Sequence, residues 1–333
     1  MAVFLARRLA YSAVLAVLGA SLTYVLAATA LRPRAGFETR TPRPPEAVVH
    51  AELRRLNLDD RVPLAVRYRT WAAGVVHGDL GHTRQDGPVG AELRRRAGVS
   101  VRLLLPGTVL GCALGVLLGA YAAARRGRAA DRAIVAGSAL LPAVPVFVLA
   151  VLLQFAAGKV NDVTGMRIFE WTGESSPGAG GPADRVRHLL LPTVTIALSQ
   201  VALYCRYQRG LMLDVLSAEH MRTARAKGLR RRRVLLRHGL RVALVPMTAY
   251  SAYAFGLMLV GAAFTEKVFG WHGLGEWLVE SIGHGDVNAV AAVGSLAAGT
   301  VLLAGLVSDV VRGVLDPRTR TAEVAAAPTT AAP

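Results

Sequence analysis

The amino-acid sequence predicts an all-α polytopic membrane protein with six transmembrane helices. Hydrophobic residues make up 53% of the 333-residue chain, and they gather in long blocks separated by basic connections. A hydrocarbon core of about 30 Å is crossed by about 20 helical residues. Six apolar blocks are long enough to span it. We place the spans at residues 9–31, 103–124, 133–157, 189–205, 242–264 and 289–311.

The charges of the short connections predict how the spans are oriented, because Lys and Arg are retained on the cytoplasmic side. The connections 125–132 and 206–241 are strongly basic, whereas the connection 265–288 is acidic. Both basic connections are therefore expected in the cytoplasm and the acidic one outside. An even number of spans then places both termini in the cytoplasm.

These spans divide the chain into four regions. The first is an uncleaved anchor that includes the first span, because its apolar run is too long for a signal-peptide core. An extracytoplasmic loop region follows, in which Leu53, Leu56 and Leu58 among charged residues predict a small helical element. The remaining five spans form a transmembrane core with its basic cytoplasmic loop, and a disordered cytoplasmic tail ends the chain. The regions are 1–31, 32–98, 99–315 with the loop 206–241, and 316–333.

Several function classes are excluded by composition and motif. The net charge is +17, but the basic residues lie between spans, so membrane topology explains them better than nucleic-acid binding does. Cys112 and Cys205 both fall in apolar blocks and lack metal-ligand spacing. His272 and His284 are also too far apart to predict a metal site. Because the sequence has no metalloprotease, nucleophile-elbow or Walker A motif, we predict neither catalytic residues nor a resident metal or cofactor.

The basic loop carries a predicted short helix where a plain connection would suffice. Ser217 can cap the helix N-terminus, and Glu219 then lies in the first turn, where the helix dipole favours an acid. Gly228 is placed to adopt the left-handed conformation that ends many helices. The helix is about ten residues, or roughly 15 Å, long. A basic helix resting on anionic lipid is the alternative interpretation of this pattern.

The sequence of this helix resembles a known signature. Residues 219–229 read EHMRTARAKGL, and RVLLRH and Pro246 follow. The stretch is similar to the signature loop of binding-protein-dependent ABC importer permeases, and more narrowly to the dipeptide/oligopeptide/nickel permease family. TEKVFGWHGLG at 265–275, LDPR at 315–318, FLARRL at 4–9 and GDLG at 78–81 also look like this family. The resemblance covers residues 4 to 320.

The resemblance implies a type I ABC importer permease fold in a bacterial cell membrane. In that family the loop helix couples the permease to a cytoplasmic ATP-binding subunit. Here the implied contact residues are Glu219, Arg222, Thr223, Ala224, Lys227 and Gly228. The implied partners are a second homologous permease subunit, two ATP-binding subunits that use ATP, and an extracytoplasmic solute-binding protein. A docking segment for that protein is expected around Glu266, Phe269, Gly273 and Gly275.

The resemblance leaves the solute open between di- or oligopeptides, which it favours, and nickel or another small solute. Two departures from the family pattern stand out. Arg222-Thr223-Ala224 replaces the general Glu-Ala-Ala, as in the peptide/nickel subgroup, and Pro33 is followed by Arg34 instead of the common Pro-Gly-Asp-Pro. A non-transporting membrane scaffold and a membrane-embedded enzyme are the alternatives from other classes.

Polar and small residues inside the spans suggest further roles. Gln154, Gln200 and Tyr204 can line a pathway, since unpaired polarity facing lipid is costly, although interhelical hydrogen bonds explain them as well. The repeated spacing of Gly111, Gly115 and Gly119 predicts close helix packing. Pro142 and Pro145 are interpreted either as a flexible kink or as tolerated prolines.

Overall fold

The computed structural model describes residues 2–38, 41–42, 44–85, 87–178, 180–258 and 262–315. Within these ranges the regular secondary structure is helical, apart from one isolated bridge between His82 and Pro88. The predicted tail 316–333 lies outside the described residues. In the described part of the chain, five helices are long and apolar enough to cross a membrane. They are α1 (Ala2–Ala30), α5 (Val89–Ala124), α7 (Val146–Thr164), α8 (Pro182–Ser217) and α14 (Val287–Leu315).

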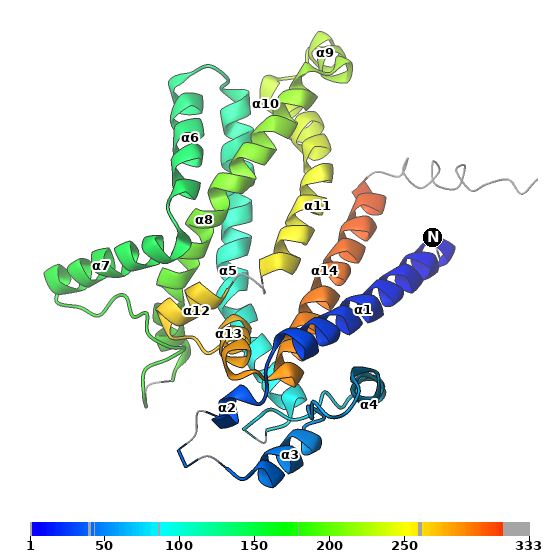
Figure 1. The fold of residues 1–333 in the computed structure, drawn as a ribbon. Helices are drawn as coiled ribbons and strands as arrows, with labels where there is room; N and C mark the ends of the chain where they lie inside the picture. Colours follow the sequence, from blue (N-terminus) through cyan, green and yellow to red (C-terminus); the bar gives the residue numbers. More distant parts are fainter. Residues whose placement is uncertain are drawn as a thin grey trace, which may run out of the picture.

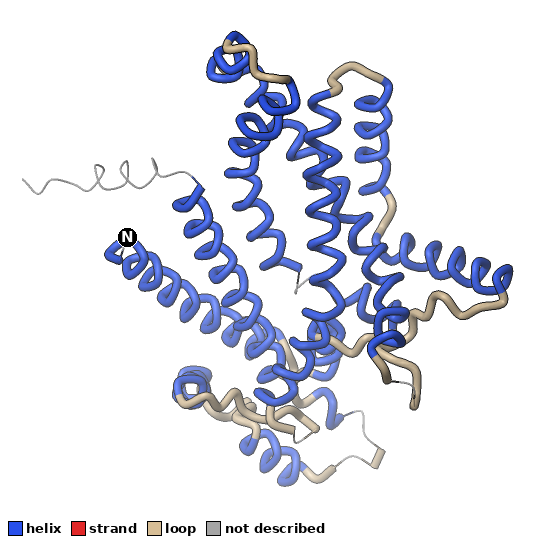
Figure 2. The backbone as a smooth tube through the Cα atoms, turned by 180° about the vertical axis from the view of Figure 1, so that it is seen from behind, coloured by secondary structure: helices blue, strands red, loops and turns tan. Residues whose placement is uncertain are grey.

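The long helices form two groups. Figures 1 and 2 show from opposite sides that α5 and α8 run side by side, while α1 and α14 form a second pair at one flank. The helix α11 (Arg241–Met258) packs on α14 and covers the fifth predicted span as far as Met258. It is not among the five candidate spans, and residues 259–261 after it lie outside the description.

The α5–α8 contact is close because glycines on α5 lack side chains at the crossing. A Cβ at Gly111 would lie 2.8 Å from the Cβ of Gln200, and one at Gly115 would lie 2.5 Å from the Cβ of Tyr204. A Cβ at Gly119 would lie 2.5 Å from the carbonyl oxygen of Cys205. The predicted packing role of these three glycines is confirmed.

The third predicted span is not one continuous helix. The chain forms α6 (Ala129–Leu140), a 3-10 turn η1 (Leu141–Ala143) and then α7, which leaves in a different direction (Figure 1). Val144 is extended, with φ −92° and ψ 118°, because the ring of Pro145 disfavours the helical conformation in the preceding residue. The two prolines therefore divide the predicted span 133–157 into two helices, and of the two interpretations of Pro142 and Pro145 the structure supports a bend.

The fourth span is longer than predicted. Hydropathy alone ends it at Arg206, whereas α8 continues to Ser217 and has 36 residues, about 54 Å at 1.5 Å per residue. Its polar ends stay helical because no residue breaks the backbone until Ala218, which is extended with φ −69° and ψ 150°. The first third of the predicted cytoplasmic loop 206–241 is thus part of α8.

Three short helices follow α1 in the predicted outer region: α2 (Ala35–Glu38), α3 (Glu46–Arg55) and α4 (Leu64–Val76). Leu53, Leu56 and Leu58 are buried there in one cluster with residues of α1 and α14, so the predicted helical element is confirmed. Tyr24 of α1 stacks on Trp71 of α4 with ring centroids 4.5 Å apart. These contacts fix the region against the first and last long helices.

Two further groups of helices lie at opposite ends of the molecule. The helices α12 (Ala263–Phe269) and α13 (Leu274–His284) lie toward the end that carries α2 to α4 (Figure 1). The helices α9 (Glu219–Ala226) and α10 (Arg231–Arg233) and the π-helix η2 (Val234–Leu240) lie at the other end, on which α5 also turns into α6.

We expect Gly115→Ala to destabilise the fold by about 1–3 kcal/mol, because the added methyl group overpacks the α5–α8 contact. The matched control is Gly210→Ala on α8, where an added Cβ meets nothing within 4 Å. That change should be neutral or stabilise by up to about 1 kcal/mol, since alanine favours helix over glycine. Unfolding of the full chain in detergent micelles measures both. A Gly115→Ala variant as stable as Gly210→Ala contradicts the described helix approach.

Candidate functional site

The predicted coupling helix exists as α9 and is bounded by two backbone breaks. Ala218 is extended between α8 and α9, and Gly228 after α9 has φ +72°, the left-handed conformation predicted for it. The helix has eight residues, slightly fewer than predicted. Ser217 is not its N-cap: it lies one residue too early, and its hydroxyl donates to the carbonyl of Asp214 at 2.8 Å within α8.

The two faces of α9 differ in exposure. Met221 and Ala224 are 0% and 7% exposed and form a cluster with Val234 of η2. Glu219, Arg222, Thr223, Lys227 and Gly228 are exposed. Five of the six predicted contact residues therefore face away from the chain, whereas Ala224 faces inward and anchors the helix. The exposed face is held in shape by an ion pair of 3.0 Å between Arg222 Nη1 and Glu219 Oε1.

The buried contacts of α9 join it to the long helix α8. A Cβ at Gly239 of η2 would lie 2.9 Å from Cε of Met212 on α8 and 3.4 Å from Cε of Met221 on α9. The absence of a side chain at Gly239 thus lets both methionines reach the π-helix. Such π-helical turns are rare and often occur at functional sites. These buried side chains bring α9 into contact with both α8 and η2.

A buried ion pair connects α6 to α8 near the same end. Asp131 Oδ1 accepts a bond of 2.7 Å from Arg209 Nε, and Oδ2 accepts bonds from Arg209 Nη2 at 3.0 Å and from the Gly127 amide at 2.8 Å. The Arg209 guanidinium and then the Gly127 amide hold the pKa of Asp131 below its usual range. In the sequence, Asp131 is the one acid among the arginines of the connection 125–132, and its pairing with Arg209 was not predicted.

The three predicted pathway residues are not gathered in one place. Gln154 on α7 donates from Nε2 to the carbonyl of Val268 on α12 at 3.2 Å. Tyr204 is fully buried on α8, with its ring edge-on to Tyr250 of α11 at 5.3 Å between centroids, and Gln200 lies one turn earlier, beside Gly111. Gln154 thus makes the interhelical hydrogen bond that was the alternative interpretation, and the pathway role of all three stays a prediction.

Sequence analysis missed one buried polar residue near this group. Gln208 is fully buried on α8, and neither its Nε2 nor its Oε1 has a hydrogen-bond partner among the described residues. Buried amides are nearly always paired, so this residue is a further candidate for contact with water or solute in the pathway. Its position one turn after Tyr204 was the signal available in the sequence.

At the end opposite α9, Glu266 organises the segment predicted to dock a binding protein. Its side chain is fully buried, and Oε1 accepts a bond of 2.5 Å from the Ser100 hydroxyl while Oε2 accepts one of 2.9 Å from the Glu276 amide. Burial raises the pKa of Glu266, and these hydrogen bonds partly offset the shift. The carboxyl group therefore links α5, α12 and α13.

Glycine is required at positions 273 and 275 because other atoms of this segment lie where a Cβ atom would be. A Cβ at Gly273 would collide with the Glu266 carboxyl group, and one at Gly275 would lie 2.5 Å from the amide nitrogen of Ala263. Phe269 is also fully buried. The side chains of Glu266 and Phe269 shape the segment from inside in this conformation, so docking by the segment stays a prediction and the surface for it must come from its exposed neighbours.

Comparison with known proteins decides the family. The family model described as binding-protein-dependent transport system inner membrane component matches residues 115–321, which include α8, α9 and the Glu266 turn. The chain belongs to this family. It is therefore a multi-pass membrane subunit of a transport system and not an enzyme, and its helical architecture is the type I importer permease fold.

Similar proteins extend the match to nearly the whole permease. The oligopeptide transport system permease protein OppB of Mycobacterium tuberculosis is 48% identical over 322 residues, covering 95% of this chain and 98% of that protein. The dipeptide transport system permease protein DppB of Escherichia coli is 32% identical over 295 residues, covering 81% and 85%. The di/tripeptide permease protein DppB of Pseudomonas aeruginosa is 32% identical over 291 residues, covering 82% and 85%.

We expect Asp131→Ala to lower the free energy of unfolding of this permease by about 1–2 kcal/mol, because it removes charged hydrogen bonds and leaves Arg209 unpaired. The double variant with Arg209→Ala should be more stable than the sum of the two single losses predicts. In the native protein the pKa of Asp131 is lowered on folding, so its contribution is present above about pH 4 and is lost as the pH falls below that. Strictly additive single losses contradict this pairing.

Proposed function

We propose that this permease forms the translocation path for di- and oligopeptides in an ATP-driven importer. The observation that carries the proposal is the match, over nearly the full length, to permease proteins of oligopeptide and dipeptide transport systems. Nothing among the described residues favours nickel over peptides as the solute.

The proposed assembly contains a second, homologous permease subunit, two ATP-binding subunits and an extracytoplasmic solute-binding protein. This chain binds no cofactor for the reaction, and ATP is used by the partner subunits. The family description supports a binding-protein-dependent system, and the exposed face of α9 offers a surface of suitable chemistry for the ATP-binding subunit. Glu219, Arg222, Thr223, Lys227 and Gly228 form that face.

Coupling in this assembly follows from how α9 is attached. Closure of the ATP-binding subunits moves α9, and the buried contacts of Met221 with Val234 and Gly239 carry the movement to α8 and η2. The long helices then shift between two arrangements that open the path to one side or the other. A membrane scaffold that transports nothing would not need these buried contacts between α9, α8 and η2.

The proposed orientation places α9 and both termini in the cytoplasm. The turn between α5 and α6, with Arg125, Arg126 and Arg128, lies at the same end of the molecule as α9 (Figure 1). Positive charge at this end favours the cytoplasmic side. The segment around α12 and α13 then faces outward, where a solute-binding protein can reach it.

The coupling face is tested by reversing one charge on it. We expect Arg222→Glu to abolish co-purification with the ATP-binding subunit and to reduce uptake of a radiolabelled tripeptide at least tenfold, since about 1.4 kcal/mol of interface energy corresponds to a factor of ten. The matched control is Arg128→Glu, an exposed arginine on the neighbouring turn at the same end. It should leave both properties near those of the unmodified chain.

The assay also separates this function from its alternatives. If α9 rests on lipid and binds no partner, the ATP-binding subunit stays attached in the Arg222→Glu variant. Unchanged uptake by that variant, at the protein level of the unmodified chain, overturns the proposed role of α9.

A further inference from the structure

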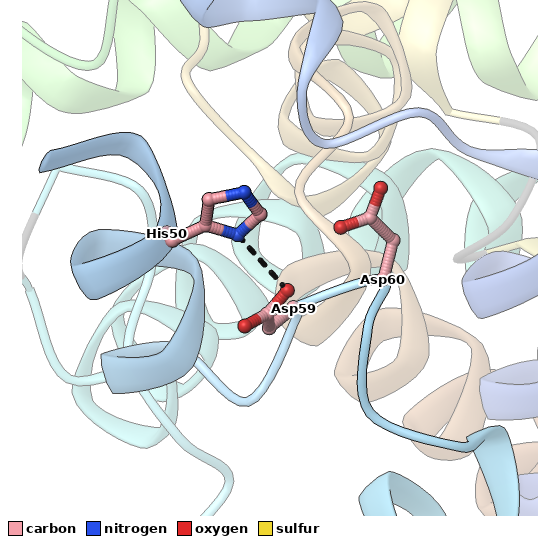
Figure 3. A group of neighbouring side chains, drawn as sticks. All are labelled: His50, Asp59 and Asp60. Carbon is pink, nitrogen blue, oxygen red and sulfur yellow. Dashed lines mark hydrogen bonds and ion pairs between the residues drawn. The ribbon is translucent and has the colours of Figure 1, made fainter. Parts of the chain in front are cut away.

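Two groups of described residues bring one histidine and two carboxylates together. In the first, shown in Figure 3, His50 Nδ1 lies 3.3 Å from Asp59 Oδ1, and Asp60 projects from the next residue of the chain. Arginine side chains already contact the polar atoms of this group. Arg34 Nη2 lies 2.6 Å from His50 Nε2, and Arg54 Nε donates to Asp59 Oδ2 at 3.0 Å. Because these guanidinium groups balance the negative charge of the carboxylates, no metal ion is needed in the first group.

The second group, formed by Glu170, Asp184 and His188, lies where the α7–α8 connection meets α8. His188 Nε2 is 3.2 Å from Glu170 Oε2 and 3.8 Å from Asp184 Oδ1. The His188 side chain is 4% exposed and those of Asp184 and Glu170 are 13% and 23% exposed. The ring is held in place by α8, and its Nε2 points to both carboxylates.

The charge of this second group is not balanced. Apart from His188, no basic side chain among the described residues forms an ion pair with Glu170 or Asp184. Carboxylates are ionised at neutral pH and are costly to bury without a cation. Asp59 and Asp131, which are also buried, each have an arginine partner, whereas buried Glu266 is held by the Ser100 hydroxyl and a backbone amide.

The Ser176 hydroxyl group lies against all three side chains of the second group. The Ser176 hydroxyl oxygen lies 2.9 Å from Glu170 Oε2, 2.9 Å from Asp184 Oδ1 and 3.1 Å from His188 Nε2. A hydroxyl group has a single proton and can donate to only one of these three atoms. When His188 Nε2 carries no proton, its lone pair and the two carboxylates face one another, and a cation bound among them balances the charge.

We propose that Glu170, Asp184 and His188 bind a divalent first-row metal ion, of which Zn²⁺ fits best. Bonds of 2.0–2.2 Å in a tetrahedral site place neighbouring ligand atoms roughly 3.3–3.5 Å apart. The two distances from His188 Nε2 lie on either side of this value, so small side-chain shifts suffice. An imidazole nitrogen among the ligands favours zinc over calcium, which takes oxygen ligands. The fourth ligand is an oxygen, and the Ser176 hydroxyl lies within 3.1 Å of all three ligand atoms.

Bound metal would fasten the α7–α8 connection to the first turns of α8. That connection also contacts α12, since the amide of Gly173 donates to the carbonyl of Phe269 at 2.8 Å. The ion therefore fixes the connection that contacts the C-terminal end of α12. This role concerns the architecture of the outward end and does not depend on which solute is transported.

The test is zinc binding to the full chain in lipid nanodiscs, after removal of metal with a chelator. We expect one Zn²⁺ per chain by metal analysis and by calorimetry. The variants His188→Ala and Glu170→Gln should weaken binding at least tenfold, and His50→Ala, in the arginine-filled group, should leave it unchanged. Glu170→Gln keeps the size of the side chain and so remains informative if His188→Ala fails to fold. X-ray absorption should show one imidazole with oxygen ligands and no sulfur.

Three outcomes overturn the proposal. The first is the absence of stoichiometric zinc binding to the folded chain. The second is binding that Glu170→Gln and His188→Ala leave intact. The third is a loss in His50→Ala as large as the loss in His188→Ala, which places the metal elsewhere.

Discussion

The close approach of α5 and α8 is the constraint on which the rest of the structure depends. Three glycines one turn apart on α5 remove the side chains that would hold the two helices apart, so that backbone and Cβ atoms of α8 fill the space. Without a hydrophobic driving force between helices in lipid, such packing is a main source of association. The pair therefore behaves as one stiff element that passes through the membrane.

This element connects the two ends at which function is proposed. At one end α8 leads into α9, whose inward face is seated on η2 and whose outward face carries the charged and polar residues. At the other end, the first turns of α8 carry Asp184 and His188 beside Glu170. There Ser100 of α5 donates a hydrogen bond to Glu266. A movement applied at α9 can reach the opposite end because α8 is helical from Pro182 to Ser217.

The sequence predicted most of the fold but not its bends. Long apolar blocks identify helices because lipid requires every backbone group to be bonded within the segment. Hydropathy says little about where a helix turns or ends, so the polar ends of α8 were missed. The prolines of the third span left a bend as one of two interpretations. The left-handed conformation of Gly228 was predictable because it depends on local backbone chemistry. The burial of Ala224 depends on contacts with η2, and the nearby sequence does not predict that π-helix.

The candidate sites were also only partly predictable from the sequence. The exposed face of α9 follows from its sequence pattern, but the burial of Glu266 and Phe269 arises from contacts with Ser100 and other distant residues. Asp184 and His188 have the spacing of one helical turn, a signal visible in the sequence, while Glu170 joins them only through the path of the connecting loop. No metal site was predicted from the sequence, because no metal-binding motif was found in it.

The most direct measurement is the distance between spin labels on α5 and α8 in the assembled transporter, by pulsed electron resonance. Labels at Leu117 on α5 and Leu203 on α8 project from exposed positions, and a third at Val307 reports on α14. The account predicts that the Leu117–Leu203 distance distribution is the same without nucleotide and with ATP trapped, while the Leu117–Val307 distribution shifts. A change between α5 and α8 with a constant distance to α14 would contradict it.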